Sequence, residues 1–337
     1  VAAVVNAADV ARQELDRRYA EGLSAWCEAG RPIRDLARHE GCHASTVLRQ
    51  IRKVEQRRED PLVDAALTAL AGEGMKRVYL DGGQMITAFL REGLVQKLMQ
   101  EEAPDVLCLQ ECKSPVDKIP MEGFAELGYR YVVARGQKGY NGVAILSKLP
   151  IRDLGDKDFA NLGHARHVAG QLENGVTIQN FYVPAGGDKP DREVNEKFGQ
   201  KLDYLTEMRD WFKGSKPQKS ILVGDLNIAP REDDVWDHKK LLKIVSHTPI
   251  EVEHLGAAQD AGKWVDVTRQ DIPSGLLYSW WSYRAKDWSG ADKGRRLDHV
   301  WATHDISNAA HSSRVLRDAR GWQQPSDHAP VFATFDL

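Results

Sequence analysis

Two textures of hydrophobic and polar positions follow one another along the chain. Residues 1–75 are rich in Ala, Arg, Glu and Leu, with few β-branched runs and no alternation, which favours helices. From residue 76 to residue 337, short apolar runs of Val, Ile and Leu alternate with amphipathic stretches and Gly/Pro turns. The pattern predicts a small all-helical segment followed by a larger α/β domain.

Six apolar runs in the second region have the length and composition of β-strands. They cover residues 105–110, 142–147, 176–184, 220–227, 297–303 and 330–337. Two amphipathic stretches predict helices, one over 91–104 that ends at Pro104 and one over 195–214 that ends at Gly214. Strands of this number with interspersed helices predict a layered α/β sandwich.

Residues 31–58, within the first region, resemble a helix-turn-helix, with Gly41 at the turn. This segment holds eight Lys or Arg residues against three Asp or Glu. Arg49, Arg52 and Lys53 on its second helix are therefore candidates for contacts with DNA. The alternative is a small helical bundle whose charges are only solvated, because basic residues on exposed helix faces are common.

Composition places the chain among ordinary globular proteins. Its 337 residues are 42% hydrophobic and 28% charged, with a net charge of −3, which excludes a mostly disordered chain and a global basic excess. No apolar run approaches the roughly 20 residues of a membrane span. The start lacks the cationic segment of a secretory signal, and the four cysteines are expected to be free or buried thiols. A cytoplasmic location is the default expectation.

Side chains that can bind a metal or move a proton stand at the ends of five apolar runs. They are Glu111, Tyr182, Asp225 with Asn227, Asp298, and Asp327 with His328. A carboxylate at the end of a buried strand is costly unless it is paired, protonated or bound to a metal. Each acid alone fits a turn or cap residue. Together they favour metal-assisted attack of water on a phosphodiester, because Mg²⁺ takes oxygen ligands.

The segments that carry these residues resemble the endonuclease/exonuclease/phosphatase superfamily, most closely its exonuclease III and apurinic/apyrimidinic (AP) endonuclease branch. They are PDVLCLQE, KGYNGVAILSK, NFYVP, GDLNIAP, YSWWSYR, GRRLDHVWAT and SDHAPV, in the family's order. The resemblance covers roughly residues 86–337. It implies a four-layered α/β sandwich, with two packed mixed sheets flanked by helices, as a catalytic domain over 76–337 after the helical extension.

The resemblance also implies which residues bind the metal, namely Mg²⁺ with Mn²⁺ as a possibility. Glu111 matches the main metal carboxylate, and Asp327 matches a second one. Asp225 and Asn227 are further candidates. Asp225 matches a residue proposed either to activate water or to protonate the leaving oxygen, and the sequence does not choose between these roles. Asn227 matches an amide that positions the phosphate or the nucleophile.

Three further positions match groups that act at the phosphate. Tyr182 matches a phenol that hydrogen-bonds there. His328 matches a histidine that contacts the scissile phosphate, and Asp298 matches its orienting partner, which would hold one tautomer of the imidazole.

The resemblance places a pocket for a flipped, baseless sugar at Trp280 and Leu297, an environment that can be apolar because no base edge is read. Arg295 stands where some relatives carry a tryptophan of the same pocket. Packing in the core is the alternative role for Trp280. Basic candidates for a DNA-binding groove are Lys138, Arg166, Arg284 and Lys286, although exposed basic residues are commonly just solvated.

One segment departs from the family pattern. The family's first strand ends in Trp-Asn-Val-Asn/Asp-Gly, whereas residues 77–85 are RVYLDGGQM, with Gly82 and Gln84 at the two amide or carboxylate positions. Asp81 could substitute by a one-residue slip, activity could be reduced, or the residues before about 86 could stem from a fusion or another reading frame. The change of texture near this segment favours the last explanation.

The function that this sequence favours is a Mg²⁺-dependent DNA repair nuclease. It would cut 5′ to abasic sites and remove nucleotides or blocked ends 3′ to 5′ from double-stranded DNA, as a monomer that binds no membrane. Two alternatives stay open. One is a phosphatase of the same superfamily, and the other is a catalytically impaired protein that only binds DNA.

Overall fold

The computed structural model describes residues 92–283, 285, 287–322 and 325–337. Of the two units into which the chain divides, 1–81 and 82–337, all of these residues belong to the second. The predicted extension over 1–75, the helix-turn-helix pattern over 31–58 and the segment 77–85 lie outside the described residues. The explanations for the departure at Gly82 and Gln84 therefore stay predictions.

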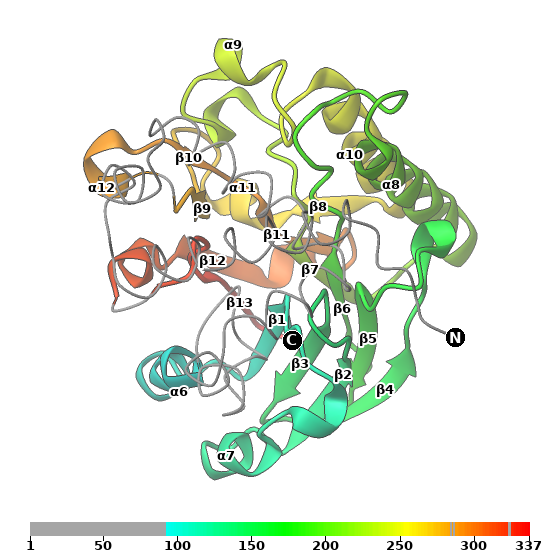
Figure 1. The fold of residues 1–337 in the computed structure, drawn as a ribbon. Helices are drawn as coiled ribbons and strands as arrows, with labels where there is room; N and C mark the ends of the chain where they lie inside the picture. Colours follow the sequence, from blue (N-terminus) through cyan, green and yellow to red (C-terminus); the bar gives the residue numbers. More distant parts are fainter. Residues whose placement is uncertain (1–91, 284, 286, 323–324) are drawn as a thin grey trace, which may run out of the picture. The chain divides into compact units, whose positions relative to one another are not determined.

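Strands in the described residues form two larger sheets and two hairpins (Figure 1). One sheet has six strands in the order β4-β5-β6-β7-β11-β8, and the other has three in the order β1-β3-β2. β6 and β7 are parallel while their neighbours are antiparallel. The bounds are β1 Val106–Gln110, β2 Tyr131–Arg135, β3 Val143–Ser147, β4 Ile151–Gly155, β5 His167–Leu172, β6 Thr177–Tyr182, β7 Ser220–Asp225, β8 Trp264–Asp266, β9 Trp280–Trp281, β10 Gly294–Arg295, β11 Asp298–Thr303, β12 Ala310–Val315 and β13 Val331–Phe335.

Helices lie between these strands in the chain and on the outside of the two sheets (Figure 1). The α-helices are α6 Glu92–Glu101, α7 Met121–Glu126, α8 Glu196–Ser215, α9 His238–Leu241, α10 Pro249–Gly262, α11 Val267–Asp271 and α12 Trp288–Ala291. The 3₁₀ helices are η2 Val116–Lys118, η3 Phe159–Asn161, η4 Glu232–Asp234, η5 Ser307–Ala309 and η6 Arg317–Gly321.

Side chains of β3 alternate between two parts of the core, as the period of a strand requires. Val143 and Ile145 pack into the cluster between the two sheets, which also contains Val300 of β11. Ala144 and Leu146 belong to a second cluster on the opposite side, together with residues of α6 and α7. The three-stranded sheet is therefore buried on both faces.

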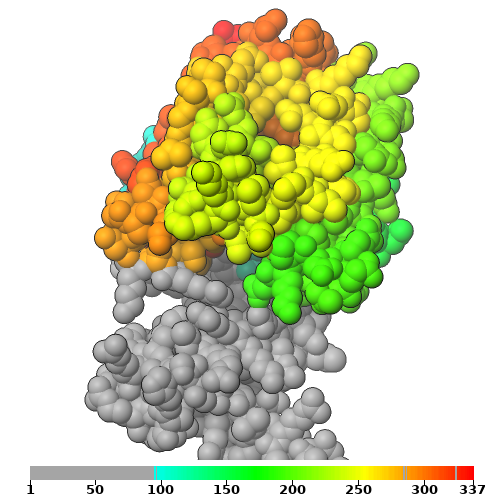
Figure 2. Space-filling model, turned by 90° about the horizontal axis from the view of Figure 1, so that it is seen from above, coloured from blue at the N-terminus to red at the C-terminus, as the bar shows by residue number. Residues whose placement is uncertain are grey.

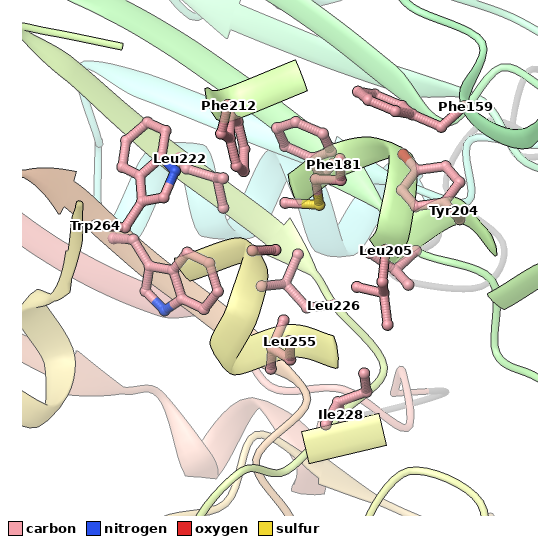
Figure 3. Packing of buried hydrophobic residues seen from close by; sticks show 14 residues of the cluster. Phe159, Phe181, Tyr204, Leu205, Phe212, Leu222, Leu226, Ile228, Leu255 and Trp264 are labelled. Atoms are coloured by element: carbon pink, nitrogen blue, oxygen red, sulfur yellow. The ribbon is translucent and has the colours of Figure 1, made fainter. Parts of the chain in front are cut away.

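The six-stranded sheet is covered on its outer face by α8 and α10. Phe181 of β6, Leu205 of α8 and Leu255 of α10 meet in this cluster (Figure 3). Figure 2, seen from above, shows the yellow-green and yellow segment that contains α9 and α10 in the middle of the view, with green atoms, the colour of α8, beside it. With α6 and α7 on the other side, the described residues form helix, sheet, sheet and helix layers, which confirms the predicted four-layered sandwich.

All six predicted strands exist, and each of their ends lies within two residues of the expected one. The predicted end of the helix over 195–214 is wrong, because α8 continues through Gly214 to Ser215. Lys216 ends it in the left-handed conformation, with φ of 46°. Pro217 follows, and a residue before proline avoids the helical region. None of the described helices has the length and apolar character needed to cross a bilayer.

Candidate active site

Three predicted residues form a row across one end of the six-stranded sheet. Tyr182 at the end of β6 pairs with Asp225 at the end of the parallel strand β7. Asp298 at the start of β11 pairs with Asp225 from the other side, because β11 runs antiparallel to β7. Residues 43 and 73 positions apart are thus neighbours through strand register alone.

Steric crowding in this row explains why the GDLN segment has a glycine at position 224. Gly224 has φ of 143°, and a Cβ atom there would stand 1.9 Å from the carbonyl oxygen of Phe181. Only glycine permits β7 to approach β6 this closely while the chain turns Asp225 into the site. Asn227 follows with φ of 54°, a left-handed conformation that asparagine adopts more easily than most residues.

Glu111 reaches the row from the three-stranded sheet. It follows β1 directly, with φ of 54°. A buried amide bridges the two sheets at this point, since Asn180 Nδ2 donates to the carbonyl oxygen of Leu109 at 3.0 Å and Gln110 Nε2 donates to Asn180 Oδ1 at 2.6 Å. The bridge places Glu111 beside Tyr182, whose hydroxyl donates a hydrogen bond to the Glu111 carboxylate.

His328 and Asp298 form a hydrogen-bonded pair. Nδ1 of His328 lies 2.8 Å from Oδ2 of Asp298, and Nε2 lies 3.9 Å from Oδ2 of Asp225. Ser279 Oγ donates to the same Asp298 oxygen at 2.6 Å, and it accepts from the backbone N–H of Asp298 at 3.0 Å. Burial alone would lower the pKa of His328, but the carboxylates of Asp298, Asp225 and Asp327 outweigh it and raise the pKa to about 10.

Asp225 is buried among acids. Its carboxylate accepts from the backbone N–H and the side-chain Nδ2 of Asn227, each at 2.9 Å. Burial is the main reason why the pKa of Asp225 rises to about 8; Asp298 and Glu111 raise it further, while His328 opposes them. This carboxyl group is therefore able to carry a proton near neutral pH.

Two further carboxylates differ in their surroundings. Lys113 Nζ lies 3.3 Å from Glu111, and although burial acts in the opposite direction, Lys113, Tyr182 and His328 hold the pKa of Glu111 below its usual value. Asp327 accepts from Trp280 Nε1 at 3.0 Å. Burial, with help from Glu111, raises the pKa of Asp327. Four acids at one sheet end leave a surplus of negative charge that favours a bound cation.

The donor set fits a hard divalent cation. Oxygen atoms of Glu111, Asp327, Asp225 and Asn227 are the ligand type that Mg²⁺ and Mn²⁺ accept. A different trio, Asp225, Asp298 and His328, offers ligand atoms within 4.8 Å of one another. That trio fits a cation less well, because Asp298 and the imidazole of His328 already satisfy each other. The oxygen donors around Glu111 are therefore the candidate ligands for a metal.

The predicted pocket residues lie beside this cluster. Trp280 and Arg295 are opposite each other in the β9–β10 hairpin, with the guanidinium carbon 5.2 Å from the Trp280 ring centre. Leu297 is buried in the same apolar cluster as Trp280. Arg295 Nη1 donates to the backbone oxygen of Val245 at 3.0 Å, while its buried Nε has no hydrogen-bond partner among the described residues.

Two of the DNA-binding candidates, Arg166 and Lys138, belong to the described residues. Arg166 lies over the Tyr182 ring, 4.6 Å from its centre, and Nη1 donates to the Tyr182 carbonyl oxygen at 3.3 Å. Lys138 is exposed in the loop between β2 and β3. The other candidates lie outside the described residues, and they are Arg49, Arg52, Lys53, Arg284 and Lys286.

Sequence reasoning missed two residues of the site. Ser279, which donates a hydrogen bond to Asp298, belongs to the YSWWSYR segment, whose tryptophans are the more prominent candidates. Lys113 stands two positions after Glu111. A basic residue this close to a candidate metal carboxylate was the available signal, whereas a serine in an aromatic segment gave none.

Comparison with known proteins identifies the family of this chain. Residues 89–328 fit the endonuclease/exonuclease/phosphatase family. Exodeoxyribonuclease III of Haemophilus influenzae is 27% identical over 254 residues, which are 72% of this chain and 93% of that relative. An AP endonuclease from Archaeoglobus fulgidus has a TM-score of 0.68 and 29% identity over 73% of this chain and 95% of its own.

A 3′ phosphatase from Neisseria, solved with a product DNA hairpin, has a TM-score of 0.67 and 30% identity. The match covers 73% of this chain and 94% of that structure. Because the family match spans more than half of the chain, the chain belongs to the endonuclease/exonuclease/phosphatase family, and its relatives place it in the exonuclease III and AP endonuclease branch.

Proposed function

We propose that this nuclease hydrolyses phosphodiesters of double-stranded DNA with Mg²⁺, for which Mn²⁺ can substitute. It cuts 5′ to abasic sites, leaves a 3′-hydroxyl, and removes nucleotides or blocked ends 3′ to 5′. The observation that carries the proposal is the gathering of Asp225, Asp298 and His328, with ligand atoms within 4.8 Å, beside the Glu111–Tyr182 pair. Relatives named for exonuclease, AP endonuclease and 3′ phosphatase activity support this substrate range.

Cationic His328 is proposed to hold a non-bridging phosphate oxygen through Nε2. Asp298 keeps Nδ1 engaged at 2.8 Å, so the ring cannot rotate away, and Ser279 fixes Asp298 in turn. The raised pKa of His328, about 10, keeps the ring charged while negative charge grows on the phosphate.

Asp225 is proposed either to take a proton from the attacking water or to give one to the leaving oxygen. Its pKa of about 8 allows both protonation states near neutral pH, and Asn227 orients both of its oxygens. Tyr182 stays protonated because burial raises its pKa well above the usual value. Its single O–H donates to Glu111 in this structure, and it would turn to the phosphate once Glu111 binds the metal. A Mg²⁺ ion held by Glu111 and Asp327 would stabilise charge on the phosphoryl and leaving oxygens.

Arg166 is proposed to contact the DNA backbone, since its guanidinium lies on the Tyr182 ring next to the site. Each phosphate contact of this kind makes binding weaker as salt rises. A monomer acting in the cytoplasm, with additional DNA contacts from Arg49, Arg52 and Lys53, completes the proposal.

A cleavage assay tests the proposal. Full-length protein is incubated with Mg²⁺ and a labelled duplex that carries one internal abasic analogue, and separately with a 3′-phosphate end and an intact duplex end. We expect a cut 5′ to the abasic analogue that disappears with EDTA and with Glu111→Ala or His328→Ala. DNA binding without any cleavage would instead support a non-catalytic protein, and hydrolysis of phosphoinositides but not DNA would support a phosphatase.

The departure before residue 86 is tested in the same assay. A variant whose segment 76–85 is restored to the family pattern is compared with the natural chain. A large gain in cleavage would show that Gly82 and Gln84 limit the activity.

A further inference from the structure

A buried ion pair lies between α8 and α10, outside the residues assigned so far. Lys201 and Glu251 have fully buried side chains, and Lys201 Nζ stands 2.5 Å from Glu251 Oε1. Lys201 interrupts an otherwise apolar face of α8, between Phe198 and Leu202. Two apolar residues of similar volume would be as stable as such a pair or more stable. Its presence therefore calls for a reason other than stability.

Lys201 donates its remaining hydrogen bonds to the loops that carry the candidate active site. Nζ donates to the backbone oxygen of Asn227 at 2.8 Å and to that of Ala185 at 3.3 Å. Asn227 is the residue in the left-handed conformation that orients Asp225. Ala185 follows the end of β6 by three residues. One ammonium group thus holds the segments after both parallel strands.

Glu251 performs the corresponding task for a third segment. Its two oxygens accept the backbone N–H of Ser246, each at 2.9 Å, and Oε2 accepts the N–H and hydroxyl of Thr248 at 3.1 and 2.7 Å. Ser246 has φ of 86°, and its hydroxyl accepts from Arg295 Nη1 at 2.7 Å. Through Ser246, Glu251 supports the side chain that faces Trp280 in the candidate pocket.

We propose that Lys201 and Glu251 are positioning residues for the nuclease reaction, which fix the Asn227 amide on one side and the Arg295 pocket wall on the other. The inference rests on the proposed function. A charged pair suits this task because its hydrogen bonds are directional and stronger than neutral ones in a dry interior. The left-handed conformation of Asn227 is uncommon for a residue other than glycine, so contacts from the surroundings help to fix it.

The test is a pair of neutralising substitutions, Lys201→Met with Glu251→Gln, made singly and together. Methionine keeps the stem of the lysine, and glutamine keeps an oxygen for Ser246 and Thr248. The single Lys201→Met variant leaves an unpaired buried carboxylate and is expected to fold poorly, whereas the double variant leaves no buried charge. The matched control is Arg269→Met, which breaks a different buried ion pair that touches Asp234.

We expect the double variant to lose about 30-fold in kcat on the abasic duplex, because a displaced catalytic group costs up to about 100-fold, while KM changes less than about twofold. Arg269→Met is expected to lower the Tm and leave kcat unchanged below it. A folded double variant with the kcat of the wild type overturns the inference. Equal kcat losses in the double variant and in Arg269→Met overturn it as well.

Hydrogen exchange measures positioning without any activity. The backbone N–H of Asn227 donates to Asp225, so exchange of the peptide over 225–229 should become at least about tenfold faster in the double variant and not in Arg269→Met. If the wild type cleaves no DNA, the proposed function fails, and this measurement alone decides the inference. Unchanged exchange in the double variant would then overturn it.

Discussion

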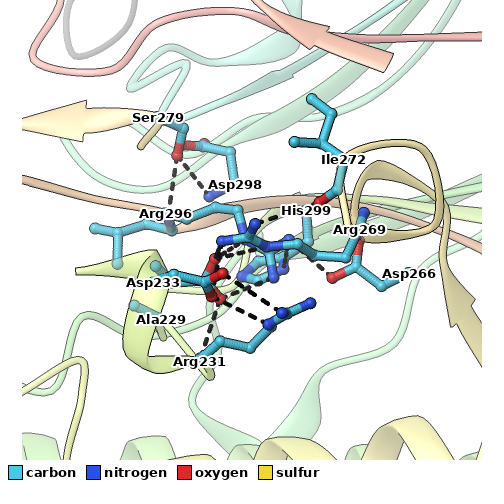
Figure 4. A network of polar contacts seen from close by, with 12 residues as sticks. Ala229, Arg231, Asp233, Asp266, Arg269, Ile272, Ser279, Arg296, Asp298 and His299 are labelled. Carbon is cyan, nitrogen blue, oxygen red and sulfur yellow. Dashed lines mark hydrogen bonds and ion pairs between the residues drawn. The ribbon is translucent and has the colours of Figure 1, made fainter. Parts of the chain in front are cut away.

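Two groups of buried charge stand next to each other in this domain and differ in their charge balance. The first, the catalytic cluster, consists of Glu111, Asp225, Asp298, Asp327 and His328. The second, the arginine network, consists of Asp234, Asp266, Arg269, Arg296 and His299. Figure 4 shows them meeting, with Asp298 bound to Ser279 while Arg296, two residues earlier, joins the network.

Every oxygen of Asp234 in the arginine network faces a guanidinium. Oδ1 accepts from Arg296 Nε at 2.7 Å and from Arg269 Nη2 at 2.5 Å, and Oδ2 accepts from Arg296 Nη2 at 3.0 Å. Burial opposes ionisation of Asp234, yet the two arginines hold its pKa below the usual value. Asp225 accepts hydrogen bonds from the neutral donors of Asn227. Burial raises its pKa to about 8, although the cationic His328 ring lies 3.9 Å away and opposes the rise.

The comparison teaches how to separate structural from chemical buried acids. A carboxylate whose cations are built into the fold has no capacity left for a proton or a metal, so it takes no part in the chemistry, and its removal leaves buried cations without a partner. A carboxylate that is equally buried but surrounded by acids pays for its position with stability and gains reactivity. The following substitutions test whether this distinction holds.

Asp225→Asn should have the largest effect on activity. It removes the proposed proton carrier, and we expect a loss of about 10³-fold or more in kcat. Stability should move the other way. In the folded protein the pKa of Asp225 is about 8, whereas its ordinary value is 3.8. The stability of the wild type therefore falls as pH rises from the lower to the higher of these values. Asparagine does not ionise, so the variant does not lose this stability. Cleavage rates, with Tm values at pH 8 in EDTA, check both signs.

An Asp225→Asn protein that is inactive and also less stable at pH 8 would contradict the distinction. It would mean that the carboxylate of Asp225 stabilises the fold in the way that Asp234 does.

Asp234→Asn should produce the opposite result. Two buried guanidinium groups lose their shared partner, which destabilises a fold by about 3–5 kcal/mol, or a Tm decrease of about 10 °C for a domain of this size. Activity at 20 °C should stay within about threefold. Asp233→Asn is the matched control, because the Asp233 side chain is 26% exposed and its removal should cost under about 1 kcal/mol.

Local patterns in the sequence predicted that the residues of the first group lie together, and they did not predict the arginine network. Each catalytic residue follows or precedes an apolar run, so the strands themselves indicate that Tyr182, Asp225 and Asp298 share an edge. Asp234 stands in the segment REDD (231–234), where an acid looks like a turn residue. Its partners are 35 and 62 positions away, and no local signal connects them.

Lys201 lies between these cases. A lysine on the apolar face of a helix, beside Phe198 and Leu202, is a visible anomaly in the sequence. The identity of its partner is not visible, because Glu251 belongs to another helix that meets α8 only in three dimensions. The end of α8 differs from the predicted one for a simpler reason, since Pro217 determines it more strongly than Gly214 does.

His299 should make the stability of the domain decrease at acidic pH, because its protonation would add a positive charge to the arginine network. Its Nε2–H donates to the carbonyl oxygen of Ile228 at 2.8 Å, and Nδ1 faces Arg296 Nη1 at 3.2 Å. Burial and then Arg296 lower the pKa to about 4. Since the unfolded chain binds the proton from about pH 6.5 downward, stability falls as pH drops from 6.5 towards 4, by about 3 kcal/mol in total.

Urea unfolding at half-unit pH steps measures this slope. His299→Gln should flatten it, and the exposed His304→Gln variant should leave it as in the wild type. His167, in the apolar cluster under α8, also has a pKa lowered to about 4 by burial, so part of the slope should persist in His299→Gln. A slope that does not change at all in His299→Gln would show that the arginine network accepts a further positive charge.

Arg295 and Arg296 are neighbours in the sequence, and they differ in how far nearby carboxylates balance their charge. Carboxylates of Asp266 and Asp234 more than offset the burial of Arg296 and raise its pKa. Arg295 gains only distant help from Glu251, and burial lowers its pKa. An under-compensated guanidinium beside Trp280 should oppose a neutral abasic sugar more than it opposes an anionic 3′ end. Arg295→Leu should therefore raise abasic-site cutting relative to 3′-phosphate removal by about tenfold, or about 1.4 kcal/mol.

The ratio of kcat/KM on the two substrates is the measurement, because a general loss of activity cancels in it. Ser246→Ala is the control, since it removes the hydroxyl that accepts from Arg295 but leaves the guanidinium in place, and it should not raise the ratio. If Ser246→Ala raises the ratio as much as Arg295→Leu does, the charge is irrelevant and the position of the pocket wall decides the substrate. If neither variant changes the ratio, Arg295 has only a structural role, as Arg296 has. The difference in charge balance between the two groups would then have no effect on substrate choice at the pocket.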